Sequence, residues 1–300
     1  MSIVSRNGGA DASGTTSITP GYPANISTGQ FLLLAVVNKY PANGPATPAG
    51  WTFLAAAQAS GGSGAAGVDT GNVFITVFYK VSDGTETGTE TVTIASGNSS
   101  YGKIFRYSGA ANGDPIPVQV TAVNGTDNTA GTAWSIVTGA VEIHAGDMVI
   151  ACSGINTDAY TYSAEAFSQT GTTFGTVNEF WDSNTLQGDD CGLVVADVLV
   201  SSGSGTGALT YTMTASGTAT NRPAGATVVF VLREVFTATI SSPVNKTVAA
   251  LTLVNTSDVP NPIEGFEGGK GKTVGRRGVH VRRHVPRDKP PDLEQIMQGR

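Results

Sequence analysis

The sequence predicts an all-β protein built as an antiparallel β-sandwich, of the jelly-roll or immunoglobulin-like kind. Two observations lead to this prediction. Only 13% of the 300 residues are charged and 39 are glycine, a composition that does not suit long helices. Short runs rich in Val, Thr, Phe and Tyr alternate with turn sequences rich in Gly, Pro, Asn and Ser. No apolar run reaches the roughly 18 residues that a membrane-spanning helix needs, so no membrane insertion is expected.

The first expected strands are separated by turn sequences such as PANGPATPAG and SDGTETG. In the run NVFITVFYKVS, the odd-numbered residues from Val73 to Val81 are all apolar, whereas the even-numbered residues between them are mixed. A wholly apolar face opposite a mixed face is typical of a strand in a sandwich. The strands expected in this part of the chain are 30–40, 51–58, 72–82, 90–96 and 102–109.

A similar order of runs recurs in the second half of the chain. GQFLLLAVV from Gly29 resembles GDMVIACSG from Gly146, and residues 72–97 align without a gap over 192–217 at an offset of 120. After this region each half has one more strand, at 102–109 and at 225–234. We therefore predict an internal duplication, with repeats at 1–112 and 113–235 of about seven strands each. Each half could form its own small sandwich, or the halves could interleave into one large sandwich.

No motif of catalysis or metal binding is present. The chain has no serine elbow, phosphate-binding loop, HExxH or EF-hand spacing, and its two cysteines and three histidines make no zinc pattern. Asp189 and Asp190 precede a strand and are interpreted as turn residues, and His144 is expected to lead into a strand at 147–152. We expect no enzyme activity, no cofactor and no metal.

Cys152 and Cys191 each adjoin an apolar run. They are predicted to be reduced, buried, small hydrophobic residues, with a disulfide between the sheets as the alternative.

Several aromatic residues could form a platform on which a sugar ring stacks. In a β-sandwich most such residues pack in the core or on a sheet face, and that interpretation is preferred. Trp51 is one of these aromatic residues, and the possible glycan site consists of Trp134, Tyr160, Tyr162 and Trp181.

The net charge of −6 hides a segregation of the two signs. Residues 270–300 hold nine of the 17 Lys and Arg residues but three of the 23 Asp and Glu residues, so this segment carries +6 and residues 1–269 carry −12. A segregation of charge like this predicts which surfaces each part of the chain binds or repels, and it does not predict the fold. The basic segment is expected to bind an acidic surface, and the acidic remainder is expected to repel nucleic acid.

Residues 236–269 are expected to contain one added strand, within 246–255, followed by a Pro/Gly-rich linker. Residues 270–300 are predicted to be an extended anchoring arm that ends in a short helix after Pro290 and Pro291. A helix this short becomes ordered only when its apolar face docks on a partner. Arginines flanking His280 and His284 oppose a metal there, and the absence of aromatic residues after Phe266 weakens a nucleic-acid interpretation. The residues predicted to bind the partner are Arg276, Arg277, Arg282, Arg283, Arg287, Leu293, Ile296 and Met297.

Four short sequences resemble a β-sandwich module of bacteriophage tail, fibre and head-appendage proteins, which also occurs in bacterial surface proteins. They are PAGW at 48–51, VFYKV at 77–81, IFRYSG followed by DPI at 104–116, and VVFVLRE at 228–234. The resemblance covers about residues 18–234 and does not extend to the basic segment. It implies a structural or adhesive role in a virion, and it offers no catalytic residue to carry over.

The expected function is therefore that of a non-enzymatic virion structural protein, namely a decoration, adaptor or fibre-type tail component. Its basic C-terminal arm would bind other virion proteins, with several copies arranged around a symmetry axis and assembled in the host cytoplasm. The start of the chain resembles no secretion signal, which agrees with this expectation. The alternative is a glycan-binding adhesin of a phage tail. A glycan depolymerase that uses Asp189 or Asp190 is a third, weaker possibility.

Overall fold

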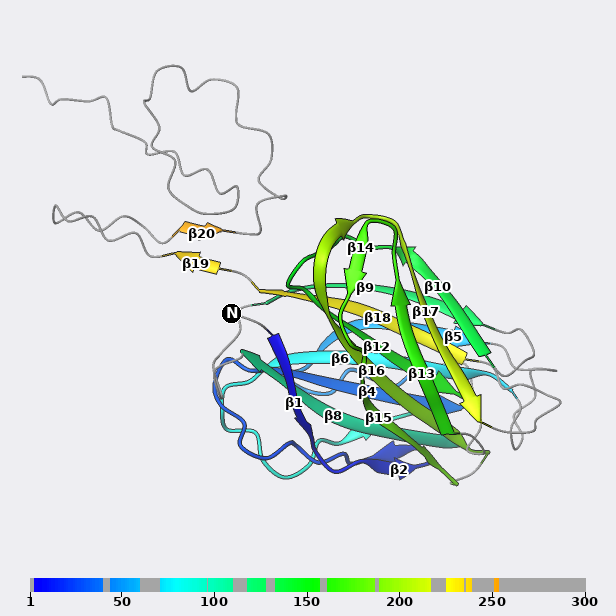
Figure 1. Cartoon of the computed structure of the whole chain (residues 1–300). Helices are drawn as coiled ribbons and strands as arrows, with labels where there is room; N and C mark the ends of the chain where they lie inside the picture. The colour runs from blue at the N-terminus through cyan, green and yellow to red at the C-terminus, as the bar shows by residue number, and fades with distance from the viewer. Residues whose placement is uncertain are drawn as a thin grey trace, which may run out of the picture. The chain divides into compact units, whose positions relative to one another are not determined.

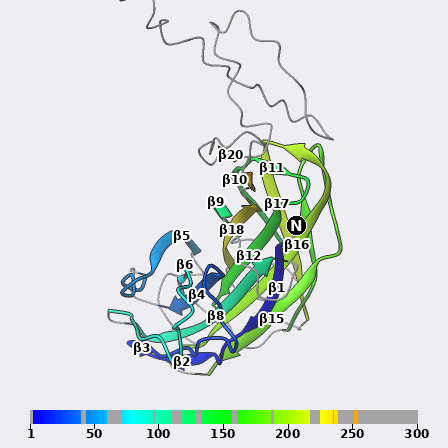
Figure 2. The ribbon, with the colours of Figure 1, turned by 90° about the vertical axis from the view of Figure 1, so that its left-hand side faces the viewer.

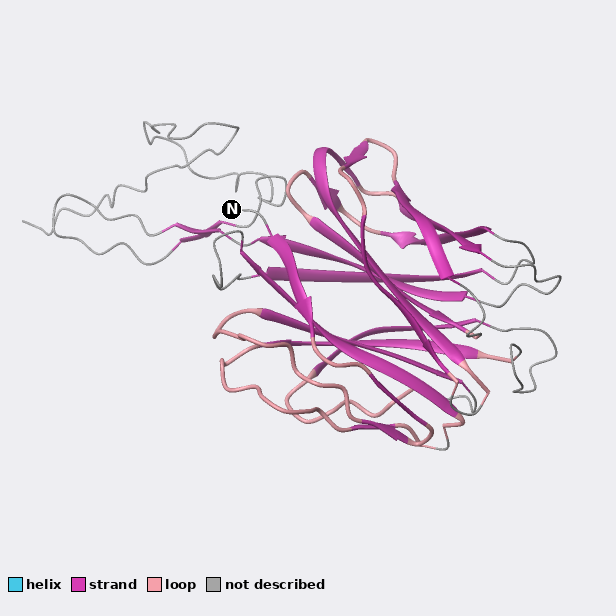
Figure 3. Cartoon of the chain, turned by 60° about the horizontal axis from the view of Figure 1, so that its bottom comes forward, coloured by secondary structure: helices cyan, strands magenta, loops and turns pink. Residues whose placement is uncertain are grey.

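The computed structural model describes residues 3–39, 44–59, 71–95, 97–109, 118–127, 133–156, 161–186, 189–216, 225–234, 236–238 and 251–253. All regular structure in these ranges is β-strand, as Figure 3 shows, and the predicted all-β class is confirmed. The described ranges contain no helix long and apolar enough to cross a membrane.

Met1–Glu234 form one compact unit, and Val235–Arg300 form a second. In the second unit one antiparallel pair is described, between β19 (Phe236–Ala238) and β20 (Leu251–Leu253). β20 lies within the run 246–255 in which an added strand was expected. The short docking helix and the whole basic segment lie outside the described residues.

The first large sheet is built entirely from residues 3–109, and all its strands are antiparallel. β1, β8, β4, β6 and β5 follow one another across it, and β2 adds to β8. A separate two-stranded sheet is formed by β3 and β7. The bounds are β1 (Ile3–Gly8), β2 (Ala12–Gly14), β3 (Ser17–Ile18), β4 (Phe31–Lys39), β5 (Thr52–Ala59), β6 (Val73–Val81), β7 (Val92–Thr93) and β8 (Ser99–Gly109).

The second large sheet is built from residues 118–234. β9, β18, β12 and β16 follow one another, and β11, β14 and β15 pair with successive parts of the long strand β16. A three-stranded sheet, in the order β10, β17, β13, covers its outer side. The bounds are β9 (Val118–Asp127), β10 (Ala133–Ala140), β11 (Ile143–His144), β12 (Met148–Ile155), β13 (Thr161–Ser168), β14 (Thr172–Phe174), β15 (Asn178–Thr185), β16 (Cys191–Gly205), β17 (Ala208–Ser216) and β18 (Gly225–Glu234).

The two large sheets match strand for strand. The order β1-β8-β4-β6-β5 in the first corresponds to β9-β18-β12-β16-β15 in the second. The registers agree as well, because Phe31 faces Val81 at the start of β4, and Met148 faces Leu199 at the start of β12. Each outermost hairpin also carries one bulge at the same place, at Leu54 in β5 and at Phe180 in β15.

The inner faces of the two large sheets pack on each other and share one core. This central core contains Phe31, Leu33 and Phe105 from the first sheet together with Ile150 and Phe230 from the second. Figure 2 shows β4, β5 and β6 of the first half (blue to cyan) on one side and the strands of the second half (green to yellow) on the other. Each sheet therefore belongs to one half, and both halves share the central core.

Each large sheet also buries its outer face, so central strands are apolar on both sides. In the first half Leu32, Leu34, Phe78 and Ile104 pack with Ile18 in a first outer core. In the second half the three-stranded sheet closes a second outer core over β12 and β16. The face pattern predicted for 72–82 is confirmed, since Val73, Ile75 and Val77 are in the central core and Phe78 is in the outer one.

Both halves enter their central strand through the same turn. Gly29 and Gly146 have φ angles of 84° and 93°, which a glycine adopts without steric cost. Gln30 Oε1 then accepts a hydrogen bond of 3.0 Å from the backbone N of Ser27. Asp147 Oδ2 accepts one of 2.7 Å from the backbone N of His144 in the same relative position. The resemblance between GQFLLLAVV and GDMVIACSG thus reflects one shared turn.

Candidate functional site

Sheet edges meet without forming a ladder at several places in the described ranges, among them β9 with β10, β5 with β9, and β13 with β15. β13 is the edge of the three-stranded sheet and pairs with β17, and β15 is the edge of the second large sheet and pairs with β16 (Figure 1). The two strands are neighbours, and one bond joins them directly, from the backbone N of Tyr162 to Asp182 Oδ2 at 2.9 Å. We call this region the seam and define it by Tyr162, Glu165, Phe167, Val177, Glu179 and Asp182.

A bulge in β13 turns Glu165 toward the interior of the seam. The register with β17 shifts between Ser163 and Ala166, and Ala164 has a φ of 56°, a left-handed conformation that costs a non-glycine residue energy. Glu165 is half-buried, whereas Ser163, Ala164 and Ala166 around it are exposed. Strain of this kind is kept only where the surrounding structure holds it in place, and it occurs often at functional sites.

Burial and neighbouring negative charge disfavour ionisation of two seam carboxylates, Glu165 and Asp182. Burial raises the pKa of Glu165, and the negative charges of Glu179 and Asp182 raise it further. The pKa of Asp182 is also raised, mainly by burial, although the hydrogen bond from the Tyr162 backbone opposes the change. The seam therefore holds negative charge that the fold itself leaves poorly compensated.

Two buried polar atoms near the seam are among those without a hydrogen-bond partner in the described ranges. One is Glu165 Oε1. The other is the hydroxyl of Tyr211, a residue of β17 that lies outside the defined seam and has 0% exposure. Burial holds the pKa of Tyr211 well above its ordinary value, and the charges of Glu165, Glu179 and Asp182 add to this, so its hydroxyl lies within their electrostatic reach. Buried groups of this kind normally have a partner, so each one needs an explanation.

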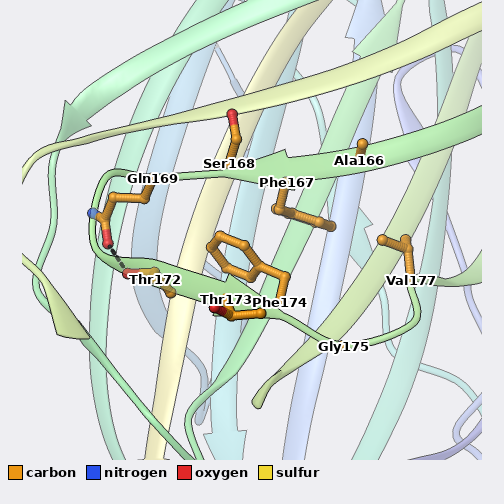
Figure 4. Close-up of a pocket in the computed structure, with 9 residues that line it drawn as sticks. All are labelled: Ala166, Phe167, Ser168, Gln169, Thr172, Thr173, Phe174, Gly175 and Val177. Carbon is orange, nitrogen blue, oxygen red and sulfur yellow. Dashed lines mark hydrogen bonds between the residues drawn. The ribbon is translucent and has the colours of Figure 1, made fainter. Parts of the chain in front are cut away.

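At one end the seam opens into a hollow of about 340 Å³. Phe167, Phe174 and Val177 form its apolar wall, and the two phenyl rings lie 6.0 Å apart at an angle of 34° (Figure 4). Gln169 closes the polar side, where its Oε1 accepts a hydrogen bond of 3.0 Å from Thr172 Oγ1. The polar side is internally satisfied, so the part that can accept a ligand is the apolar wall beside the carboxylates.

The aromatic residues predicted as a glycan platform are not brought together on the surface. Trp134 and Tyr162 are 1% and 4% exposed and stack in the second outer core with their ring centroids 5.1 Å apart. Their core interpretation is the one that the structure supports. Tyr160 lies outside the described residues.

Trp181 packs on the other side of β15. The Lys103 ammonium lies over its ring, 3.3 Å from the ring centroid. Lys103 is 5% exposed and also donates to the Gly9 carbonyl at 2.6 Å. Burial lowers the pKa of Lys103, and the nearby Asp11 carboxylate opposes this. Trp181 is thus a contact between the two halves through a cation–π interaction.

The residues considered for chemistry have structural roles. The carbonyl of Asp189 accepts a hydrogen bond from Lys39 and its carboxylate accepts one from Asn98, so this turn ties the two halves together. Asp190 adopts a φ of 60° in the turn. His144 is buried and its Nε2 lies 2.8 Å from Glu142 Oε1 in the turn before β12. No group of His, Cys, Asp and Glu in the described ranges is arranged to hold a metal ion.

Cys152 and Cys191 are both free and fully buried, as predicted. Burial raises the pKa of the Cys191 thiol to about 12. Burial also raises the pKa of Cys152.

Sequence reasoning missed the seam itself. One signal was available, because Tyr162 and Phe167 both point inward but are separated by five positions. Residues on one face of a regular strand are an even number apart, so this odd spacing indicates a bulge. The partners Glu179 and Asp182 could not be found in this way, since only the fold brings β15 beside β13.

A second polar cluster was also missed, in the first half. Tyr22 stacks on Trp51 at 6.3 Å, and Glu90 accepts hydrogen bonds of 2.5 Å from the Tyr22 hydroxyl and 3.0 Å from Trp51 Nε1. The Tyr22 hydroxyl and Trp51 Nε1 both donate to Glu90 Oε2, so the cluster joins three loops, those before β4, before β5 and after β6.

Comparison of the chain with protein-family models, with curated proteins and with solved structures gives no match.

Proposed function

We propose that this chain is a non-enzymatic structural protein of a virion, a decoration, adaptor or fibre-type tail component. The folded unit is the rigid part that the particle displays, and the basic segment 270–300 attaches it to acidic surfaces of neighbouring virion proteins. The symmetric homo-oligomer and the virion location belong to the same proposal.

The observation that carries the proposal is the separation of charge from fold. The compact unit ends at Glu234, and the +6 segment belongs to a separate unit of the same chain. A cationic segment outside a compact acidic unit can contact a partner without disturbing the fold. Attachment through one charged segment is weakened by salt, and it becomes durable when many copies bind one particle together.

The contacts of the residues considered for chemistry suit a role in display. Asp189 is engaged in bonds to Lys39 and Asn98, and His144 is engaged with Glu142. The glycan-binding alternative has lost its main support, since two of its four residues are core residues.

Incorporation into particles tests the proposal. The full chain and a chain lacking residues 270–300 are produced in cells that assemble the particle, and the amount of each in purified particles is measured. We expect the shortened chain to keep its β-sheet circular dichroism and its melting temperature but to be absent from particles. A matched variant with Arg276, Arg277, Arg282, Arg283 and Arg287 changed to Lys should remain largely incorporated, because it keeps the charge. Recovery of the shortened chain in particles at the level of the full chain would overturn the proposal.

A further inference from the structure

The charge of the folded unit is concentrated in its second half, where the seam lies. Residues 1–112 contain five basic and five acidic residues, whereas residues 113–235 contain two basic and 12 acidic residues. The first half is therefore neutral and the second half carries −10. A cationic segment attracted to this protein would be drawn to the second half, because opposite charge concentrates there.

The seam is rich in hydrogen-bond acceptors. Glu165 Oε1 has no partner among the described residues, and Glu179 and Asp182 add two more carboxylates. Since carboxylates only accept hydrogen bonds, a ligand for this site must supply several donors and positive charge. A guanidinium has five N–H donors in a planar fork, and it binds carboxylates more specifically than an ammonium does.

The hollow beside the carboxylates adds a second requirement. Phe167, Phe174 and Val177 leave room for an apolar side chain, and Phe167 follows Glu165 by two positions on the strand. An extended peptide places residues i and i+2 on the same face about 7 Å apart. The seam therefore suits an extended peptide in which an arginine is followed two positions later by an aliphatic residue.

The chain itself contains such a peptide. In GVHVRRHV, Val285 follows Arg283 by two positions, and Arg282 adds a second guanidinium. This sequence lies in the +6 segment, so each copy of the chain carries both the acidic seam and a cationic peptide that complements it.

We propose that the seam of one copy binds the segment 279–285 of a second copy, with Arg283 at Glu165 and Glu179 and Val285 in the hollow. The guanidinium donates hydrogen bonds to the carboxylates of Glu165 and Glu179. The contact is head-to-tail, so it can repeat around a ring or along a filament. This inference rests on the proposed function and identifies the acidic partner of the basic segment as another copy of the same chain.

Two complementary variants test the inference with the full chain. The seam variant carries Glu165→Gln and Glu179→Gln, and the segment variant carries Arg282→Gln and Arg283→Gln. Molar mass is measured by sedimentation velocity up to about 100 µM protein at about 50 mM salt, where exposed charges are weakly screened. We expect the unaltered chain to self-associate under these conditions and to dissociate at about 0.5 M salt.

Each variant alone is expected to be monomeric, because it lacks one side of the contact. An equimolar mixture is expected to form a dimer and nothing larger, since the seam variant supplies an intact segment and the segment variant supplies an intact seam. The change Asp83→Asn in the first half also removes one negative charge, from an exposed position, and should leave self-association unchanged. Recovery of binding in the mixture shows that neither variant is merely misfolded.

Two results would overturn the inference. One is a monomeric full chain at every concentration, and the other is self-association that persists in either variant. Particle incorporation distinguishes this failure from a failure of the proposed function. If deletion of residues 270–300 abolishes incorporation while the seam variant is incorporated normally, the segment binds a different acidic protein and the proposed function stands.

Discussion

The two halves of the folded unit follow one plan and differ mainly in one connection. Between β4 and β5 the chain has 12 residues, 40–51, whereas between β12 and β15 it has 22, 156–177. The longer connection contains β13, which adds a third strand to the outer sheet and forms one side of the seam, and β14, which pairs with β16. The two halves thus differ in a loop, where change is tolerated and binding sites commonly arise. The following predictions test or refine this comparison.

The largest difference in stability is expected at the shared entry turn. Asp147 pairs with the buried Arg233 at 3.1 Å, whereas its counterpart Gln30 is a neutral amide at 3.3 Å from Arg106 Nη1. Asp147→Ala leaves the Arg233 guanidinium without its carboxylate and should cost about 3–5 kcal/mol in the free energy of unfolding. Gln30→Ala should cost about 1–3 kcal/mol, because it removes a hydrogen-bond acceptor but no charge. Urea unfolding measures both free energies. Equal losses in the two variants would show that the charge of Asp147 contributes nothing beyond what the neutral Gln30 contributes.

The next largest loss of stability is expected at Gly154, where the two halves pack tightly on each other. A Cβ added at Gly154 of β12 would lie 2.9 Å from Val37 Cγ2 and 3.1 Å from Ile75 Cβ, both in the first half. Gly154→Ala should therefore destabilise the protein by about 1–3 kcal/mol through overpacking. Gly139→Ala is the matched control, since its nearest neighbour would be an ordinary contact at 3.7 Å within the second half. Thermal unfolding of the two variants side by side checks the expectation. An unchanged melting temperature in Gly154→Ala would mean that the central core adjusts to accept the added methyl group.

A smaller effect is expected from the strained residue of the seam, which has no counterpart in the first half. Ala164 has a φ of 56° and is exposed, so Ala164→Gly relieves strain without removing a contact. We expect the free energy of unfolding to rise by up to about 1 kcal/mol. Ser163→Gly next to it lacks this gain and should be neutral or destabilising. Denaturant unfolding of both variants shows whether the bulge stores strain.

The smallest effect is a dependence on pH. Folding raises the pKa of Glu165 and of Asp182, so their contribution to stability is fully present at acidic pH and is lost as the pH rises through the raised values. Glu165→Gln should thus stabilise the protein near neutral pH by less than about 1 kcal/mol, since solvent screens a half-exposed carboxylate. The gain should disappear at low pH. Melting curves recorded across the acidic range test this, and a loss of stability at neutral pH would contradict it.

Much of the fold could be predicted because the two periodicities that define strands are visible in the sequence. The expected strand 225–234 has the observed bounds, and 72–82 and 30–40 are within one residue at each end. The expected strand 90–96 was too long, since regular pairing is limited to Val92–Thr93 and the flanking residues bond irregularly to the segment 16–20.

The alignment of the two halves shows where sequence reasoning reached its limit. The structure matches Val81 of β6 with Leu199 of β16, an offset of 118, whereas the sequence suggested 120. A shift of two residues keeps every side chain on its own face, so the hydrophobic pattern cannot detect it. The seam was missed because a sequence pattern does not show that β13 and β15 become neighbours. In the sequence alone, Glu179 and Asp182 look like ordinary polar residues of a strand.

The shared central core has a consequence for how the protein can be made. When the ribosome has released residues 1–112, the inner face of the first sheet, with Phe31, Leu33 and Phe105, has nothing to cover it. Synthesis of the second half takes several more seconds, during which this apolar surface is open to other nascent chains. A genetic fusion that carries one half alone should accumulate as insoluble material, and separate expression of the two halves in one cell should restore solubility to both.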